Sequence, residues 1–231
     1  MRFIAPRFLV ALAACVVALS CGDVPTFAGG IVYISPIVLP SPSVAAGDQL
    51  RDSTGKVAPL QVIAYDTGNV PIPNLAVTYV ISSVPAGGAT IDDKGFLKAD
   101  DSVRTLQIVA RIGSSLQTSA ATLEIVPQPD ALEAAGTVDS LVSLSYSSPI
   151  QVKVSGVRGG TRVPVKAIVV RYQITKVNGL AAVDSNQFKL VDDAKNTVRG
   201  DPRTAVDTTD VSGVAGRVLL PIQATFTSVE V

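Results

Sequence analysis

The sequence contains no histidine and no tryptophan, and it has only two cysteines, Cys15 and Cys21. Without histidine there is no Ser-His-Asp triad, no Cys-His pair and no His-ligated zinc or haem. Charged residues are few, at 16% of the chain, and 19 basic residues balance 19 acidic ones. Nucleic-acid binding needs a basic surface, so we expect no nucleic-acid partner. Hydrophobic residues make up 47% of the 231 residues, which is enough to build a core.

The first residues have the pattern of an export signal. Arg2 and Arg7 give a positive start, and an uninterrupted apolar run of 12 residues extends from Phe8 to Leu19. This run suits a signal peptide and is too short to cross a bilayer as a helix. Gly22 and Asp23 then end it abruptly.

The stretch Ala18-Leu19-Ser20-Cys21 resembles a bacterial lipobox, where the peptide is cut before a Cys whose sulfur then carries diacylglycerol. The preferred pattern has Leu in place of Ala18. A second stretch, Leu12 to Cys15, matches the pattern letter for letter, but cutting there leaves only seven apolar residues in the signal. We therefore predict a signal peptide at 1–20 and lipidation at Cys21, followed by a tether to residue 30. The alternative is an ordinary secretory signal or an uncleaved anchor.

Beyond residue 30 the sequence predicts β-structure throughout. Val, Ile and Thr are frequent, Gly and Pro recur between short apolar runs, and no window keeps a helical period for three turns. Evenly spaced short strands are typical of an antiparallel sandwich. The expected strands are 31–39, 60–65, 75–82, 106–112, 121–126, 141–146, 150–155, 167–177, 187–191, 216–222 and 224–231.

Two halves of this region resemble each other. The segment Pro59 to Val62 returns as Pro149 to Val152, 90 residues later. The pattern V-x-Y-x-I at Val77 to Ile81 returns at Val170 to Ile174, 93 residues later. Two further matches, Val70-Pro71-Ile72 with Val163-Pro164-Val165 and Ala46-Gly47 with Ala135-Gly136, keep the same order. These matches predict a tandem repeat of one β-domain.

The stiff spacer Pro127-Gln128-Pro129 lies between the repeats. We therefore expect two domains, 31–127 and 130–231. In the V-x-Y-x-I strands the period of two sends Tyr79 and Tyr172 to the core and Arg171 to solvent.

Three motifs resemble bacterial Ig-like domains, the Big families of invasin- and intimin-type surface proteins. Ala89 to Leu97 (ATIDDKGFL) is similar to an A-T-I-D-x-x-G-x-L segment, and Thr208 to Ala215 (TTDVSGVA) to a T-D-x-x-G-x-A hairpin. Asp66 to Pro73 is similar to the D-x-x-G-x-P-V turn of both. The resemblance implies two tandem immunoglobulin-like β-sandwiches without an inter-sheet disulfide. It also implies a stalk, an adhesive module or a carbohydrate-contacting unit, and it brings no catalytic residues.

Other chemical motifs are weak. Ser53 to Lys56 matches S-x-x-K but lies in an expected turn rather than on a helix. The tripeptide Arg199-Gly200-Asp201 matches an integrin-binding motif and is common by chance. Aspartates cluster in the second domain and favour capped turns over calcium binding: Asp184, Asp192, Asp193, Asp201, Asp207 and Asp210. We therefore expect no catalytic residues, no metal site and no cofactor.

Together these features predict a non-enzymatic lipoprotein of the bacterial cell envelope. The lipid on Cys21 would hold it at a membrane, at the outer membrane or cell surface, and the sandwiches would serve as a structural or adhesive module. The expected partners are the membrane and a protein or glycan ligand. The alternative is a carbohydrate-binding or accessory subunit of a surface assembly.

The family resemblance also implies one strand more than the sequence provides after 224–231. We therefore expect the second sandwich to lack its final strand. Either the chain is a truncated product, or a partner's strand completes the sheet by β-augmentation.

Overall fold

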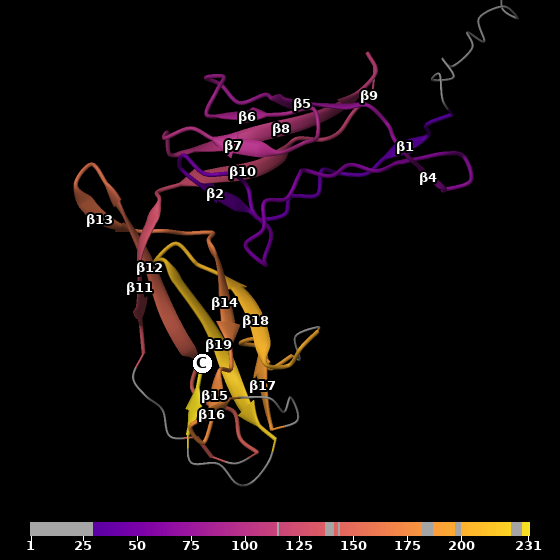
Figure 1. The fold of residues 1–231 in the computed structure, drawn as a ribbon. Coiled ribbons are helices and arrows are strands. Elements are labelled where there is room, and N and C mark those ends of the chain that lie inside the picture. Colours follow the sequence, from indigo (N-terminus) through magenta and orange to yellow (C-terminus); the bar gives the residue numbers. More distant parts are fainter. Residues whose placement is uncertain are drawn as a thin grey trace, which may run out of the picture.

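The computed structural model describes residues 30–114, 116–136, 141–142, 144–181, 187–196, 200–222 and 228–231. All regular secondary structure in these residues is β-strand, and the strands form two sandwiches (Figure 1). The predicted all-β fold class is therefore confirmed. No helix within the described part of the chain is long and apolar enough to span a membrane.

The main sheet of the first sandwich has the strand order β2-β10-β8-β5. Strand β2 runs parallel to β10, whereas β10, β8 and β5 pair antiparallel. The short strand β9 pairs antiparallel with the C-terminal end of β8. The bounds are β2 (Ser43–Ala45), β5 (Val77–Ile81), β8 (Arg104–Ile112), β9 (Leu116–Gln117) and β10 (Ala121–Val126).

The opposite layer of this sandwich contains the hairpin of β6 (Ala89–Ile91) and β7 (Leu97–Ala99). Gln49 forms an antiparallel β-bridge with Lys98 of β7, so the segment around Gln49 belongs to the same layer. Alternate residues of β8 point inward and are fully buried, as a sheet covered on one face requires. The largest fully buried side chains of this core are Leu50, Leu97, Leu106, Ile108, Leu123 and Ile125.

A smaller three-stranded sheet projects from the same sandwich. It has the order β1-β3-β4, with bounds β1 (Tyr33–Ile34), β3 (Ala64–Tyr65) and β4 (Pro71–Ile72). One of its faces packs on a separate apolar cluster that includes Ile31 and Ile112. In Figure 1 this sheet lies at the end of the first sandwich that is remote from the second one.

The second sandwich has a sheet of order β11-β12-β19-β17, and β13 forms a hairpin with β12. The strand pairs of this sheet are all antiparallel. The bounds are β11 (Pro129–Ala134), β12 (Ile150–Arg158), β13 (Thr161–Pro164), β17 (Phe188–Val191) and β19 (Val214–Pro221).

The facing layer of the second sandwich contains the pairs β14-β18 and β16-β15-β20. Tyr172 in β14 is only 4% exposed and sits in the core with Val170 and Ile174. The alternation expected for this strand is therefore confirmed. The bounds are β14 (Val169–Gln173), β15 (Lys176–Val177), β16 (Leu180–Ala181), β18 (Thr204–Thr208) and β20 (Val229–Glu230).

The structure also corrects three expectations. Described residues of 141–146 form no strand, because Leu144 has a φ of 59° and bends the chain. The spacer is shorter than expected, since β11 begins at Pro129 itself. The T-D-x-x-G-x-A segment is not a hairpin, since β18 pairs with β14 whereas β19 pairs with β12 and β17.

Candidate functional site at the junction of the two sandwiches

Only two residues separate the sandwiches. Strand β10 ends at Val126 and β11 begins at Pro129, so Pro127 and Gln128 form the whole link. Pro129 has a fixed φ and no backbone N–H to donate, which suits the first residue of an edge strand. Val126 is buried and belongs to the core cluster of the second sandwich. The last strand of one sandwich therefore contributes directly to the core of the other.

Two polar contacts cross the junction. The Ser43 hydroxyl of β2 donates to the carbonyl oxygen of Ala167 at 2.5 Å. The ammonium group of Lys166 donates to Oε1 of Glu124 in β10 at 2.8 Å. Ala167 has a φ of 59°, so the loop before β14 turns sharply where it meets the first sandwich. These bonds tie the loop before β14 to β2 and β10 of the first sandwich.

Gly156 shows how closely the link is packed. A side chain at this position of β12 would collide with the carbonyl oxygen of Gln128 and press on Val165, which is fully buried. Only glycine lets β12 approach the linker backbone this closely. The backbone of the link thus packs closely against β12, while the Gln128 side chain is exposed.

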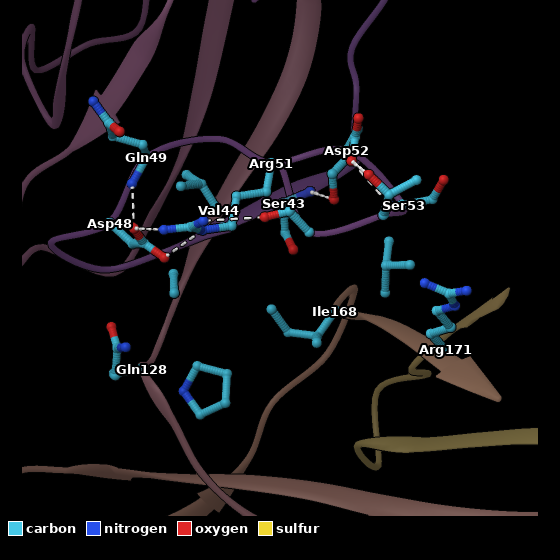
Figure 2. A pocket seen from close by; sticks show the side chains of 16 residues that line it. Ser43, Val44, Asp48, Gln49, Arg51, Asp52, Ser53, Gln128, Ile168 and Arg171 are labelled. Carbon is cyan, nitrogen blue, oxygen red and sulfur yellow. Dashed lines mark hydrogen bonds and ion pairs between the residues drawn. The ribbon is translucent and has the colours of Figure 1, made fainter. Parts of the chain in front are cut away.

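A groove of about 400 Å³ opens on one side of the junction. Figure 2 shows Asp48, Gln49 and Arg51 on its first-sandwich wall, with Ile168 and Arg171 on the opposite side. Most of its lining residues have polar side chains, and none is aromatic. Hydroxyl and amide groups of this kind can hydrogen-bond a polar ligand, but the groove offers no ring on which a sugar could stack.

The acidic groups of the groove are occupied by local partners. The Arg51 guanidinium makes two hydrogen bonds to Asp48, which hold the pKa of that carboxyl below its usual value. The pKa of Asp52 is also lowered, because the Thr54 hydroxyl donates to its Oδ1 at 2.6 Å. These carboxylates shape the loop from 48 to 56 and are poorly placed to accept a proton during catalysis.

The S-x-x-K match lies in this same loop. Ser53 and Thr54 form a tight turn that Asp52 closes, and Lys56 is exposed just beyond it. No helix places the hydroxyl and the amine one turn apart, as the motif's chemistry requires. Arg171 supplies an exposed guanidinium on the other wall, so the groove suits binding of a polar or anionic group better than covalent chemistry.

A second groove, of about 350 Å³, flanks the junction and was not foreseen from the sequence. Its charged lining consists of Arg104, Arg158 and Lys166 beside a single carboxylate, Glu124. Lys166 is paired with Glu124, which leaves the two arginines as excess positive charge. These residues come from three strands and one loop far apart in the chain, so no sequence pattern could have grouped them.

Several of the described aspartates of the second sandwich are engaged by local partners. Asp192 and Asp210 accept hydrogen bonds from backbone N–H groups in turns, and Asp207 pairs with Arg217 at 3.1 Å. Asp201 is held by Arg203, which lowers the pKa of its carboxyl to about 2. No group of three potential ligands comes together within the described ranges.

Several predicted residues lie outside the described part of the chain. These are Cys15 and Cys21, Asp184, and Arg199 of the Arg-Gly-Asp tripeptide. Lipidation at Cys21 therefore stays a prediction.

One recurring turn accounts for the motifs that resemble bacterial Ig-like domains. An aspartate begins the turn, and its backbone N–H donates to the carbonyl oxygen of the fifth residue. The N–H of the fourth residue donates to the carbonyl oxygen of the aspartate. The fourth residue has a positive φ, between 60° and 86°. Its aspartate Oδ1 accepts from backbone N–H groups further along the turn. Among the described residues this turn begins at Asp52, Asp66, Asp92, Asp192 and Asp210.

Comparison with protein-family models and with curated protein sequences gives no match. Among solved structures, domains 4 and 5 of the S-layer protein SbsC are 8% identical, with a TM-score of 0.34, covering 84% of this chain and 88% of that one. The Yersinia pseudotuberculosis adhesin InvE is 13% identical, with a TM-score of 0.30, covering 83% of this chain and 53% of that one. The Escherichia coli adhesin FdeC is 12% identical, with a TM-score of 0.31, covering 83% of this chain and 55% of that one.

This chain spans about half of each of the two adhesin structures. Identities and TM-scores this low carry no argument about what the chain binds or does. The class of protein follows instead from the chain's own sheets: it is an all-β protein of two β-sandwiches joined by a closely packed two-residue link.

Proposed function

We propose that this chain is a non-enzymatic structural module of the bacterial cell envelope, a short stiff stalk that holds a surface away from a membrane. The observation that carries the proposal is the junction. Val126 of the first sandwich is buried in the core of the second, and the link is only Pro127 and Gln128. Two β-domains fixed in this way move as one body, which suits spacing or presentation better than closure around a substrate.

The proposal assigns a role to each part of the chain. Residues 1–20 are a signal peptide, and Cys21 carries the lipid. Residues 21–30 are the tether, and the two sandwiches follow, one on each side of the link at Pro127 and Gln128. The resemblance of the turn motifs to invasin- and intimin-type Ig-like domains supports a place at the outer membrane or cell surface.

A carbohydrate-binding or accessory role is the second candidate. The polar groove at the junction is the observation that favours it, since Ser, Thr, Gln and Arg side chains there could hydrogen-bond a glycan. The same groove has no aromatic platform, so we place this role behind that of a stalk.

The envelope proposal is tested by metabolic acyl labelling and membrane fractionation of the full chain. Cys21→Ala should abolish labelling and release the protein from membranes, because it removes the acylated sulfur. Cys15→Ala is the matched control and should remain labelled and membrane-bound. Acyl groups found on Cys15, or an unlabelled wild-type chain, would overturn the assigned anchor.

A further inference from the structure

The small sheet of β1, β3 and β4 has two chemically different faces. Its register aligns Ile34, Ala64 and Ile72 in one row, and this row packs on the apolar cluster at the end of the first sandwich. The neighbouring row aligns Tyr33, Tyr65 and Pro71. Because successive residues of a strand point to opposite faces, this second row faces away from the cluster.

The outer face is apolar and aromatic. Tyr33 is 53% exposed, and its ring lies 5.8 Å from that of Tyr65, centroid to centroid. Ile63 lies two residues before Tyr65, on the same side, and is also exposed. Pro71, in the same row, is exposed as well. We call Tyr33, Ile63, Tyr65 and Pro71 the tyrosine face.

The tyrosine face lies in a part of the chain that has almost no charge. Residues 30–47 carry no charged side chain, and residues 57–91 carry one, Asp66. The Asp66 carboxylate accepts hydrogen bonds from the N–H groups of Gly68 and Val70, at 2.8 and 2.9 Å. It is therefore engaged in its turn. A face without free charge, with Tyr33 exposed and Tyr65 half-buried beside it, matches neither an acidic nor a basic protein partner.

The place of this sheet in the chain indicates what covers the face. Tyr33 follows Cys21 by 12 residues, so a fully extended tether keeps it within roughly 40 Å of the acylated sulfur. The sheet also lies at the end of the molecule remote from the second sandwich (Figure 1). If Cys21 is lipidated, the tyrosine face is at the base of the stalk, close to the bilayer.

We propose that the tyrosine face rests on the lipid surface in which Cys21 is anchored. This inference rests on the anchor assigned above. Tyrosine favours the zone between lipid chains and water, because its ring is apolar and its hydroxyl is polar. The lipid already holds the chain at the membrane, so the second contact is intramolecular and needs little affinity of its own. Such a contact sets the angle at which the stalk leaves the membrane.

The absence of native tryptophan permits a direct test. Residues 21–231, which have Cys21 as their single thiol, are coupled through it to a maleimide lipid in phosphatidylcholine vesicles with brominated acyl chains. The variant Tyr33→Trp should show blue-shifted emission and quenching by the brominated lipid. The matched control is Leu180→Trp, at an exposed site in β16 of the second sandwich, and it should show neither. Adding Ile63→Ser and Tyr65→Ser to Tyr33→Trp should reduce the quenching.

Quenching at position 33 no stronger than at position 180 would overturn the proposal. So would emission at position 33 that responds to peptidoglycan fragments and not to vesicles, since the face would then be a saccharide site. The maleimide coupling replaces the native lipid, so this result does not depend on acylation in cells. A failed anchor is detected separately by the acyl labelling of the full chain.

Discussion

At the scale of single residues, aspartate carries much of the local architecture. Asp92 is representative: its Oδ1 accepts from the N–H groups of Lys94 and Phe96, at 2.9 and 2.8 Å. Gly95 supplies the positive φ that closes the turn. The D-x-x-G pattern behind the family resemblance therefore encodes a turn, and it indicates a fold without indicating a ligand.

The contribution of the Asp92 turn to stability can be tested with the neighbouring Asp93 as a control. Asp92→Ala removes two hydrogen bonds to the backbone and should lower the free energy of unfolding by about 1 kcal/mol. Asp93, the next residue, is exposed and accepts no such bond, so Asp93→Ala should stay within roughly 0.5 kcal/mol. Urea unfolding of both variants gives the comparison. Equal losses would mean that charge, and not the turn, is what matters.

The titratable residues predict how stability depends on pH. Arg203 lowers the pKa of Asp201 to about 2 from 3.8, so this carboxyl stabilises the fold above pH 3.8 and loses that effect as the pH falls toward 2. Burial raises the pKa of Tyr172 to about 12 from 10.0, so its contribution is lost as the pH rises between these values.

The chain has no histidine, the side chain that ordinarily titrates near neutral pH. The melting temperature should therefore be level from about pH 5 to 9. Thermal melts across the range test this expectation. A step near neutral pH would contradict it.

At the scale of strands, regular alternation was the reliable signal. Strand β10 has the predicted bounds, and β8, β12 and β17 fall close to the predicted ones, because each has a face that packs on a core. The segment predicted as one strand at 167–177 is divided between β14 and β15. Strand β11 was missed because its Pro, Asp and Glu residues disfavour strands, which an edge position tolerates. The segment 141–146 alternates as a strand does, yet Leu144 is 69% exposed and lies in a turn.

Strand β14 allows the alternation to be tested by substitution. Tyr172→Ala should lower the free energy of unfolding by about 3–5 kcal/mol, because it empties a large buried site. Arg171→Ala, one residue earlier on the exposed side, should change it by no more than roughly 0.5 kcal/mol. Chemical denaturation of both variants measures the difference. A small loss for Tyr172→Ala would place the ring outside the core.

At the scale of the whole molecule, the sequence indicated where the two sandwiches meet but not how. The three residues from Pro127 to Pro129 suggested a spacer, whereas the contacts that fix the junction are non-local. Ser43 meets Ala167, and Glu124 meets Lys166, across separations that no sequence pattern reveals. The two grooves beside the junction were missed for the same reason.

Gly156 tests the packing of the link. Gly156→Ala forces a methyl group against the Gln128 carbonyl and should destabilise the protein by about 1–3 kcal/mol, the range for overpacking. Gly136→Ala is the control, because a side chain there meets only the Pro149 carbonyl oxygen at 3.9 Å. Its cost should stay within roughly 0.5 kcal/mol by the same unfolding measurement. Equal costs would mean that β12 does not pack closely against the backbone of the link.

The central claim, that the two sandwiches move as one body, is tested most directly by a distance between them. Lys98 in β7 and Gln173 in β14, both exposed, are each replaced by cysteine and spin-labelled. The protein used is residues 21–231 carrying Cys21→Ser, so that only these two sites react. Double electron–electron resonance should give one narrow distance distribution. Inserting Gly-Ser-Gly between Pro127 and Gln128 should broaden it, because the inserted residues free the link. A wild-type distribution as broad as that of the insertion variant would contradict the account.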